Sequence, residues 1–126
     1  MCYVKGNYKT FDVILVDFGE VKFAGEQGGV RPAVIVQNNI GNIHSQTTLV
    51  MPFSTSLKKM NQSTHSFFES DMSKGLKYDS VLLGECLRQI SEQRIIKKLG
   101  HLFDTDDKIK VKNVYDANFG LSAMEA

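Results

Sequence analysis

Short segments rich in β-branched and aromatic residues recur along the whole chain, and they constrain its fold more than any other feature. Such segments are typical of strands. Turns that contain Gly, Asn or Ser separate six of them, at residues 11–18, 32–38, 46–54, 63–70, 80–91 and 97–103. A seventh segment, residues 105–123, instead has helical spacing of its apolar residues: Val111, Val114, Tyr115 and Leu121. Many short strands before a late helix predict a mostly β (α+β) fold, a small β-barrel or sandwich closed by a C-terminal helix.

Local signals predict details within this pattern. Residues 39–46 are rich in Asn and Gly and predict a turn. Pro52 cannot donate to a ladder, so its part of the strand is expected at a sheet edge or a bulge. Gly84 predicts an irregularity in its strand. The predicted helix caps are Ser91 for one short turn, and Asp104 or Thr105 for the late helix.

Length and composition predict one ordinary globular domain. The chain has 126 residues, of which 42% are hydrophobic and 23% charged, and these values exclude a disordered or fibrous protein. Residues 1–10 are expected as a lead-in to the first strand, 11–122 as the domain and 123–126 as a tail. No apolar run approaches the length of about eighteen residues that a membrane span needs. Without an export signal, Cys2 and Cys86 predict a reduced, cytoplasmic protein without disulfides.

The net charge of +1 limits the nucleic acid that this chain can bind. A protein that coats long nucleic acid needs a large positive excess, because each neutralised phosphate adds affinity through counterion release. A local patch could still hold a short stretch, and its candidate cations are Lys22, Arg31, Lys58 and Lys59. The alternative is that these side chains are scattered surface charges.

The most informative stretch is GEQGGVRPAVIVQNN, residues 25–39. It closes a loop of about thirteen residues, which is longer than most connections and therefore suggests a functional role. Arg31 precedes Pro32, so its backbone is restricted to extended geometry and its side chain projects from a defined point. A guanidinium can bind phosphate with two parallel hydrogen bonds. The alternative is that Arg31 pairs with a structural carboxylate such as Asp17 or Glu26.

Other candidate residues each have a functional and a structural interpretation. Glu26 and Glu85 could accept or position a proton, or could be surface charges. Ser54 and Thr55 end a strand, where hydroxyl groups can bind a phosphate oxygen or cap a loop. The three histidines and two cysteines lack the spacing of metal ligands, so we expect no metal site. The histidines are His44, His65 and His101.

Several segments resemble, in order, the MazF/PemK family of toxin endoribonucleases: FDVILVDF, GEQGGVRPAVIVQNNIGN, LVMPFST, and DSVLLGECLRQI followed by QRI. The resemblance covers residues 11–121. It implies a small SH3-like barrel of the CcdB/PemK type that acts as a homodimer. It also implies cytoplasmic, metal-independent and cofactor-independent cleavage of single-stranded RNA at specific sequences, and neutralisation by a cognate MazE-like antitoxin.

The resemblance also assigns roles to residues of this chain. Arg31 matches the catalytic arginine of the family, and Glu26 matches the acidic residue of its EQ pair. Ser54 stands at the position usually held by a catalytic threonine, and Glu85 matches an acidic residue that is a base in some members. Ser54 keeps the hydroxyl but lacks the methyl group that restricts threonine. The expected RNA-binding residues are Gln27, Gly28, Gly29, Thr55, Lys58 and Arg88.

The chemistry that the resemblance implies uses the 2′-hydroxyl of RNA as the nucleophile. This oxygen attacks the adjacent phosphorus and expels the 5′-oxygen, which leaves a 2′,3′-cyclic phosphate and a 5′-hydroxyl. Arg31 would offset charge on the phosphoryl oxygens, and Glu26 or Glu85 would orient or accept the proton. Two alternatives are a barrel that binds RNA without cleaving it and a CcdB-like gyrase poison. The second needs a C-terminal tryptophan, and this chain has no Trp.

Overall fold

The computed structural model describes residues 7–24, 27–57 and 62–120. Over these residues the backbone forms seven strands, two α-helices and three short 3-10 turns. The strands are β1 (Asp12–Asp17), β2 (Val30–Ile35), β3 (Thr47–Ser54), β4 (His65–Phe68), β5 (Ser80–Leu83), β6 (Arg88–Ser91) and β7 (Ile95–His101). The helices are α1 (Asn39–His44) and α2 (Thr105–Asp116), and the 3-10 turns are η1 (Met72–Lys74), η2 (Gly84–Cys86) and η3 (Glu92–Arg94).

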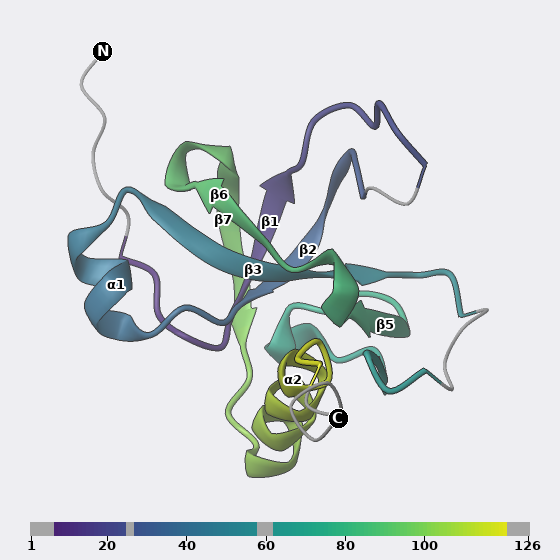
Figure 1. Cartoon of the computed structure of the whole chain (residues 1–126). Coiled ribbons are helices and arrows are strands. Elements are labelled where there is room, and N and C mark those ends of the chain that lie inside the picture. The colour runs from purple at the N-terminus through teal and green to yellow at the C-terminus, as the bar shows by residue number, and fades with distance from the viewer. Residues whose placement is uncertain (1–6, 25–26, 58–61, 121–126) are drawn as a thin grey trace.

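The strands form one antiparallel sheet in the order β4-β5-β3-β2-β1-β7, and β6 also pairs with β3. Strand β3 crosses the molecule from α1 to the side of β5, with β1, β2 and β7 running across it (Figure 1). Among the described residues β4 and β7 end this order, so strand pairing leaves the sheet open. The mostly β fold with helices is confirmed, whereas closure into a barrel stays a prediction.

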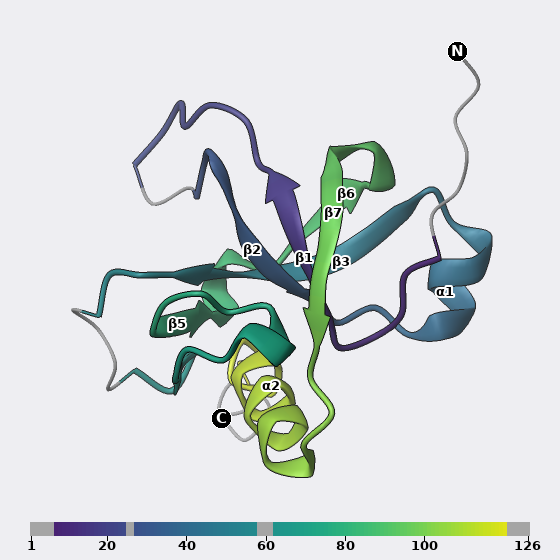
Figure 2. The same ribbon diagram turned by 180° about the vertical axis from the view of Figure 1, so that it is seen from behind.

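Both faces of the sheet are buried because successive residues of a strand point to opposite sides. In β1, Val13 belongs to one hydrophobic cluster and its neighbour Ile14 to the other. Helix α2 packs against the first cluster through Val111 and Val114 and lies across the end of the sheet near β5 (Figure 2). The second cluster comprises Ile14, Val16, Phe18, Ala33, Ile35, Val50, Ile90 and Ile95. The two clusters hold β2 and β3 rigidly at the centre of the fold.

Pro52 lies on a central strand and not on an edge strand, and the predicted edge or bulge takes the form of a local gap in the pairing. On one side it pairs with Ala33 of β2. On the other side, the pairing of β3 with β6 ends at Val50 and the pairing with β5 begins at Phe53. Pro52 therefore occupies the gap where β3 changes partners, and there a missing N–H costs no ladder hydrogen bond.

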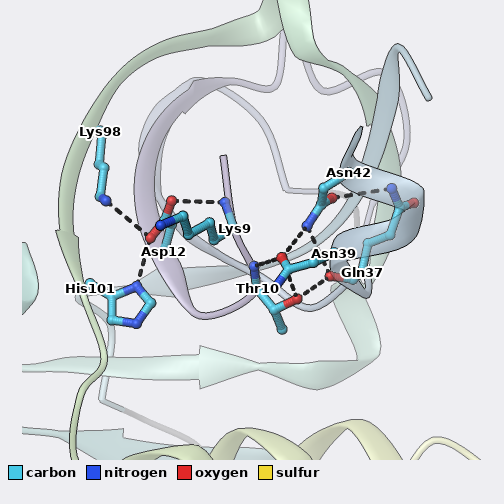
Figure 3. A network of polar contacts seen from close by, with 8 residues as sticks. All are labelled: Lys9, Thr10, Asp12, Gln37, Asn39, Asn42, Lys98 and His101. Atoms are coloured by element: carbon cyan, nitrogen blue, oxygen red, sulfur yellow. Dashed lines mark hydrogen bonds and ion pairs between the residues drawn. The ribbon is translucent and has the colours of Figure 1, made fainter. Parts of the chain in front are cut away.

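Residues 39–44 form the short helix α1, and the prediction of a turn there is wrong. The side chain of Asn38 accepts a hydrogen bond from the Gly41 N–H at 2.9 Å and caps the helix. Long-range contacts fix it further: the Thr10 N–H donates to Asn39 Oδ1 at 2.8 Å, as Figure 3 shows. The buried Asn42 adds a bond to the Gln37 carbonyl. The bond from Thr10 is tertiary, and the local sequence could not have predicted it.

Gly84 breaks the segment 80–91 into two strands with different roles. Strand β5 pairs with β3 and β4 before the break, and β6 pairs with the other end of β3 after it. The predicted irregularity at Gly84 is confirmed, and it is a full 3-10 turn. Ser91 caps the next turn, η3, by accepting from the Gln93 N–H at 3.2 Å, as predicted.

Gly84 is also a close-packing position, and replacing it with alanine is expected to destabilise the protein. A Cβ there would lie 2.8 Å from the Val114 carbonyl oxygen and 2.9 Å from the Thr64 carbonyl oxygen, and against the Val114 side chain. Backbone atoms cannot rotate away, so we expect Gly84→Ala to lower the free energy of unfolding by about 1–3 kcal/mol. Urea denaturation measures this value. The control is Gly120→Ala, whose Cβ meets nothing within 4 Å; equal losses in the two variants would contradict the packing argument.

Helix α2 ends earlier than its sequence pattern suggested. Asp104 is its N-cap, although without a side-chain cap hydrogen bond, and Asp106 and Asp107 lie in its first turn. Val111 and Val114 are buried, but Tyr115 is exposed, so only part of the predicted apolar face packs. Leu121, Cys2 and the tail at 123–126 lie outside the described residues. No helix within the described ranges is long and apolar enough to span a membrane.

Candidate functional site

Arg31 lies in β2, earlier in the strand than the sequence indicated, and is held by its own loop. It stands opposite Val16 of β1. Its Nε donates to the Gly28 carbonyl at 3.0 Å, and its Nη1 donates to Gln27 Oε1 at 2.5 Å. Both acceptors are neutral, so these bonds orient the guanidinium without neutralising its charge.

The alternative partners considered for Arg31 were two carboxylates. Asp17 accepts a hydrogen bond from the Gly19 N–H at 2.9 Å and so closes a tight turn at the end of β1. Glu26 lies outside the described residues. The geometry of the described part therefore gives Arg31 backbone and amide partners, which leave its charge for an external anion.

Ser54 ends β3, the strand that pairs with the strand of Arg31. The register of β2 and β3 matches Ala33 with Pro52 and ends there, two residues after Arg31 and two residues before Ser54. The Ser54 hydroxyl is half-exposed and accepts from the Ser56 N–H at 3.2 Å. Arg31 and Ser54 thus lie at the same end of two neighbouring strands, and both line one groove.

A groove of about 620 Å³ runs beside these two residues and has a positive lining. Its cations are Arg31, Lys77 and Lys97, and none of the described residues that line it is acidic. Its hydroxyl groups come from Ser54, Thr55, Ser56, Tyr78 and Ser80. We call it the Arg31 groove. Three cations without a carboxylate favour an anionic ligand.

Three residues that line the Arg31 groove form a row across the sheet. Leu15 of β1 pairs with Pro32 of β2 on one side and with Lys97 of β7 on the other. Tyr78 is 60% exposed at the rim, and the Lys77 ammonium lies 5.5 Å from the centre of its ring. A cationic groove with an exposed aromatic ring is typical of single-stranded nucleic-acid sites.

The sequence did not identify Lys77, Tyr78 and Lys97. Lys77 and Tyr78 follow η1, and Lys97 lies on β7. Only the strand order brings these segments to the groove around Arg31. No local motif could have predicted their convergence.

Glu85 lies on η2 and is paired with a buried histidine. His65 Nε2 lies 2.5 Å from Glu85 Oε1, and the side chains are 3% and 46% exposed. Burial raises the pKa of Glu85, but hydrogen bonds from His65, the Glu85 backbone N–H and Thr64 outweigh it and lower that pKa below its ordinary value. Glu85 is thus held as a carboxylate, oriented by a side chain that the sequence had marked only as a weak signal.

Cys86 lies close enough to Glu85 and to Arg31 for both charges to act on its thiol. Burial raises the pKa of the Cys86 thiol, the negative charge of Glu85 raises it further, and the positive charge of Arg31 opposes the rise. Both charges therefore act on one residue. Glu85 itself is not among the residues that line the Arg31 groove.

The remaining predicted RNA-binding residues are distributed over the loop and β6. Thr55 lines the Arg31 groove. Gly29 has a φ of 75°, and its N–H and carbonyl bond to Gly19 and Phe18 and close the base of the β1–β2 loop. Gly28 is buried, in contact with Val21. Lys58 and Lys59 lie outside the described residues.

Arg88 and Lys22 lie apart from the Arg31 groove and line a second hollow. Of the four cations of the predicted patch, the structure describes Lys22 and Arg31 and not Lys58 and Lys59. Lys22 and Arg31 line different hollows, so they do not form one patch. Over the described ranges, no three His, Cys, Asp or Glu side chains are grouped as metal ligands would be. Independence from metal stays a prediction.

Comparison with known proteins gives consistent matches over most of the chain. A family model described as "PemK-like, MazF-like toxin of type II toxin-antitoxin system" matches residues 9–114. The protein "Endoribonuclease MazF" of Staphylococcus saprophyticus is 37% identical over 115 residues, which cover 91% of this chain and 93% of that protein. The protein of the same name from Staphylococcus epidermidis is 39% identical over 114 residues, or 90% and 92% of the two chains.

Solved structures share the fold at lower sequence identity. One is the "Endoribonuclease in complex with its cognate antitoxin from Mycobacterial species". It superposes with a TM-score of 0.72 at 17% identity and covers 91% of this chain and 97% of that chain.

Proposed function

The chain belongs to the family of PemK-like, MazF-like toxins of type II toxin–antitoxin systems, and from that premise we propose that it is an endoribonuclease with its active site in the Arg31 groove. The observation that supports this site best is the lining of three cations without a carboxylate. Such a lining suits the phosphodiester backbone of RNA. Its substrate is single-stranded RNA, since the groove is open and carries an exposed tyrosine for stacking.

Arg31 binds the scissile phosphate and stabilises the charge that develops on its oxygens. A guanidinium carries five N–H donors, and the two bonds to Gln27 and Gly28 use only two of them. The others can reach a phosphate while the loop keeps the side chain oriented. Donors fixed before the reaction stabilise the transition state because they need no reorganisation.

Ser54 and Glu85 complete the proposed reaction. The 2′-hydroxyl loses its proton to Glu85, its oxygen bonds to phosphorus, and the bond from phosphorus to the 5′-oxygen breaks. The 5′-oxygen takes up a proton, so the products are a 2′,3′-cyclic phosphate and a 5′-hydroxyl. Ser54 donates to a phosphoryl oxygen, which its position beside Arg31 supports. Glu26 stays an alternative for the base.

The pair of His65 and Glu85 makes the proposed base testable through pH. The pKa of Glu85 is lowered from 4.5. In a plot of kcat/KM against pH, we therefore expect the acidic limb, where protonation of Glu85 stops the reaction, to lie below pH 4.5. His65→Leu removes a hydrogen bond that lowers this pKa and leaves the burial that raises it, so the limb moves to higher pH. The control His44→Leu changes an exposed histidine of α1 and leaves the limb in place. An unmoved limb in His65→Leu would exclude Glu85 as the base.

The finer features of the family are part of the same proposal. We expect an SH3-like barrel, supported by the way β3 pairs with β2, β5 and β6. We also expect a cytoplasmic homodimer that a MazE-like antitoxin neutralises, supported by the similar fold of an endoribonuclease solved with its cognate antitoxin.

One experiment separates the proposed function from its alternatives. The protein is incubated with a defined single-stranded RNA in EDTA, and the product ends are analysed. Fragments with 5′-hydroxyl and 2′,3′-cyclic phosphate ends support the endoribonuclease. Bound but intact RNA would instead indicate a binding module, and inhibition of gyrase with no effect on RNA would indicate a gyrase poison.

A further inference from the structure

A second positively lined hollow lies at the base of the β1–β2 loop, outside the Arg31 groove. Its volume is about 400 Å³. The residues that give it chemical character are Phe18, Glu20, Lys22, Phe23, Arg88 and Arg94. Three of them are cations and one is a carboxylate, so the lining has an excess of two positive charges. We call it the loop-base hollow.

Neutral groups hold both arginines of this hollow. Arg94 Nη1 donates to the Asp17 carbonyl at 3.2 Å, and Arg88 Nη1 makes a long bond of 3.5 Å to the Phe18 carbonyl. The Arg88 guanidinium also lies 5.5 Å from the centre of the Phe18 ring. Carbonyl oxygens and a ring orient the guanidinium groups without cancelling their charge. Their remaining donors suit a phosphate.

The loop-base hollow continues the face that carries Arg31. Val16 pairs with Arg31 across β1 and β2, and Phe18 follows two residues later on the same face, in the same hydrophobic cluster as Val16. Arg88 follows Cys86 by two residues, and the Cys86 thiol experiences the charge of Arg31. The two hollows share no lining residue, so the link between them is Arg31 itself, on the sheet face that Val16 and Phe18 also occupy.

We propose that Arg88, Arg94 and Lys22 form a second phosphate subsite, which binds a phosphate of the RNA strand next to the scissile one. The proposal rests on the proposed function, since it extends the same substrate site. Phe23 is 73% exposed at this hollow, and an aromatic ring beside a cationic lining favours a nucleic acid over a small free anion. The subsite increases the affinity of the protein for RNA and does not contact the reacting atoms.

The test measures the salt dependence of binding for the full-length protein and its Arg94→Gln variant. The probe is a fully 2′-O-methylated copy of an RNA that the protein cleaves, because it lacks the nucleophile and stays intact. Each phosphate contact on a single strand contributes about −0.7 to the slope of log K against log salt. We expect Arg94→Gln to reduce the slope by about 0.7 and to weaken binding several-fold. Glutamine keeps an N–H donor for the Asp17 carbonyl, so the loop anchor is retained.

Matched variants make the outcomes distinct. Lys22 lines the same hollow, so Lys22→Gln should reduce the slope by a similar amount. Arg94→Lys keeps the charge and should keep the slope. Lys112 lies on the exposed face of α2, so Lys112→Gln should leave the slope unchanged. An unchanged slope in both Arg94→Gln and Lys22→Gln overturns the subsite, with the endoribonuclease intact. If the unsubstituted protein neither binds nor cleaves RNA, the proposed function itself fails.

Discussion

Replacing Arg31 with alanine is expected to lower kcat/KM for RNA cleavage by about 10²–10³-fold, or about 2.7–4 kcal/mol of transition-state stabilisation. Arg31 is the cation that lies in the groove beside Ser54, and its two hydrogen bonds to Gln27 and Gly28 fix its orientation before RNA arrives. Alanine removes the donors that the developing charge needs. Single-turnover cleavage of a defined RNA measures the loss, and most of it should fall on the chemical step.

Two controls separate this role from stability and from simple charge. Arg31→Lys keeps the charge but cannot form two parallel hydrogen bonds, so we expect an intermediate loss. Arg31 is only half-buried, so the free energy of unfolding of Arg31→Ala should stay close to that of the unsubstituted protein. Cleavage by folded Arg31→Ala at the original rate would refute the assigned role.

Replacing Asp12 with alanine is expected to lower the free energy of unfolding by about 3 kcal/mol, because it breaks a buried ionic cluster. Asp12 is fully buried at the start of β1. Its Oδ1 lies 2.6 Å from His101 Nδ1 and 3.2 Å from Lys98 Nζ, and its Oδ2 accepts from the Lys9 N–H at 2.9 Å. Figure 3 shows the side chains of Lys98 and His101 and the backbone N–H of Lys9 converging on the carboxylate.

The cluster is structural, so its loss should affect stability and not the chemistry of cleavage. His101 stands opposite Asp12 in the ladder between β1 and β7, and alanine would leave these donors without their shared acceptor. Asp116→Ala removes the exposed pair with Lys112 and should cost about 0.3–0.5 kcal/mol. Chemical denaturation of both variants measures the difference. Similar losses in the two variants would show that the Asp12 cluster contributes little.

The sequence predicted the strands well because their signals are local. The β-branched segments around Val13, Val34 and Val50 became strands β1, β2 and β3. Gly84 and Ser91 also acted as predicted, since a break and a cap depend on neighbouring residues. Helix α1 was missed in part because a bond from Thr10, 29 residues before Asn39 in the chain, stabilises it.

The candidate site was predictable only in part. Arg31 and Ser54 stood out through a proline constraint, a strand end and a family resemblance, and both line the Arg31 groove. His65 carries only a weak local signal, and Lys77 and Lys97 carry none. Their positions follow from the strand order, which periodicity does not determine. A sequence can thus indicate the central cation more readily than the residues that surround it.

The most direct test of the account is a structure of the protein bound to an RNA with a single 2′-deoxy substitution at the cleaved nucleotide. This RNA keeps its phosphates but lacks the nucleophile, so it should bind without being cut. The account predicts the uncut phosphate in the Arg31 groove, with guanidinium nitrogens about 2.7–2.9 Å from its oxygens and the Ser54 hydroxyl in contact. A phosphate bound elsewhere, with Arg31 contacting only Gln27 and Gly28, would contradict it.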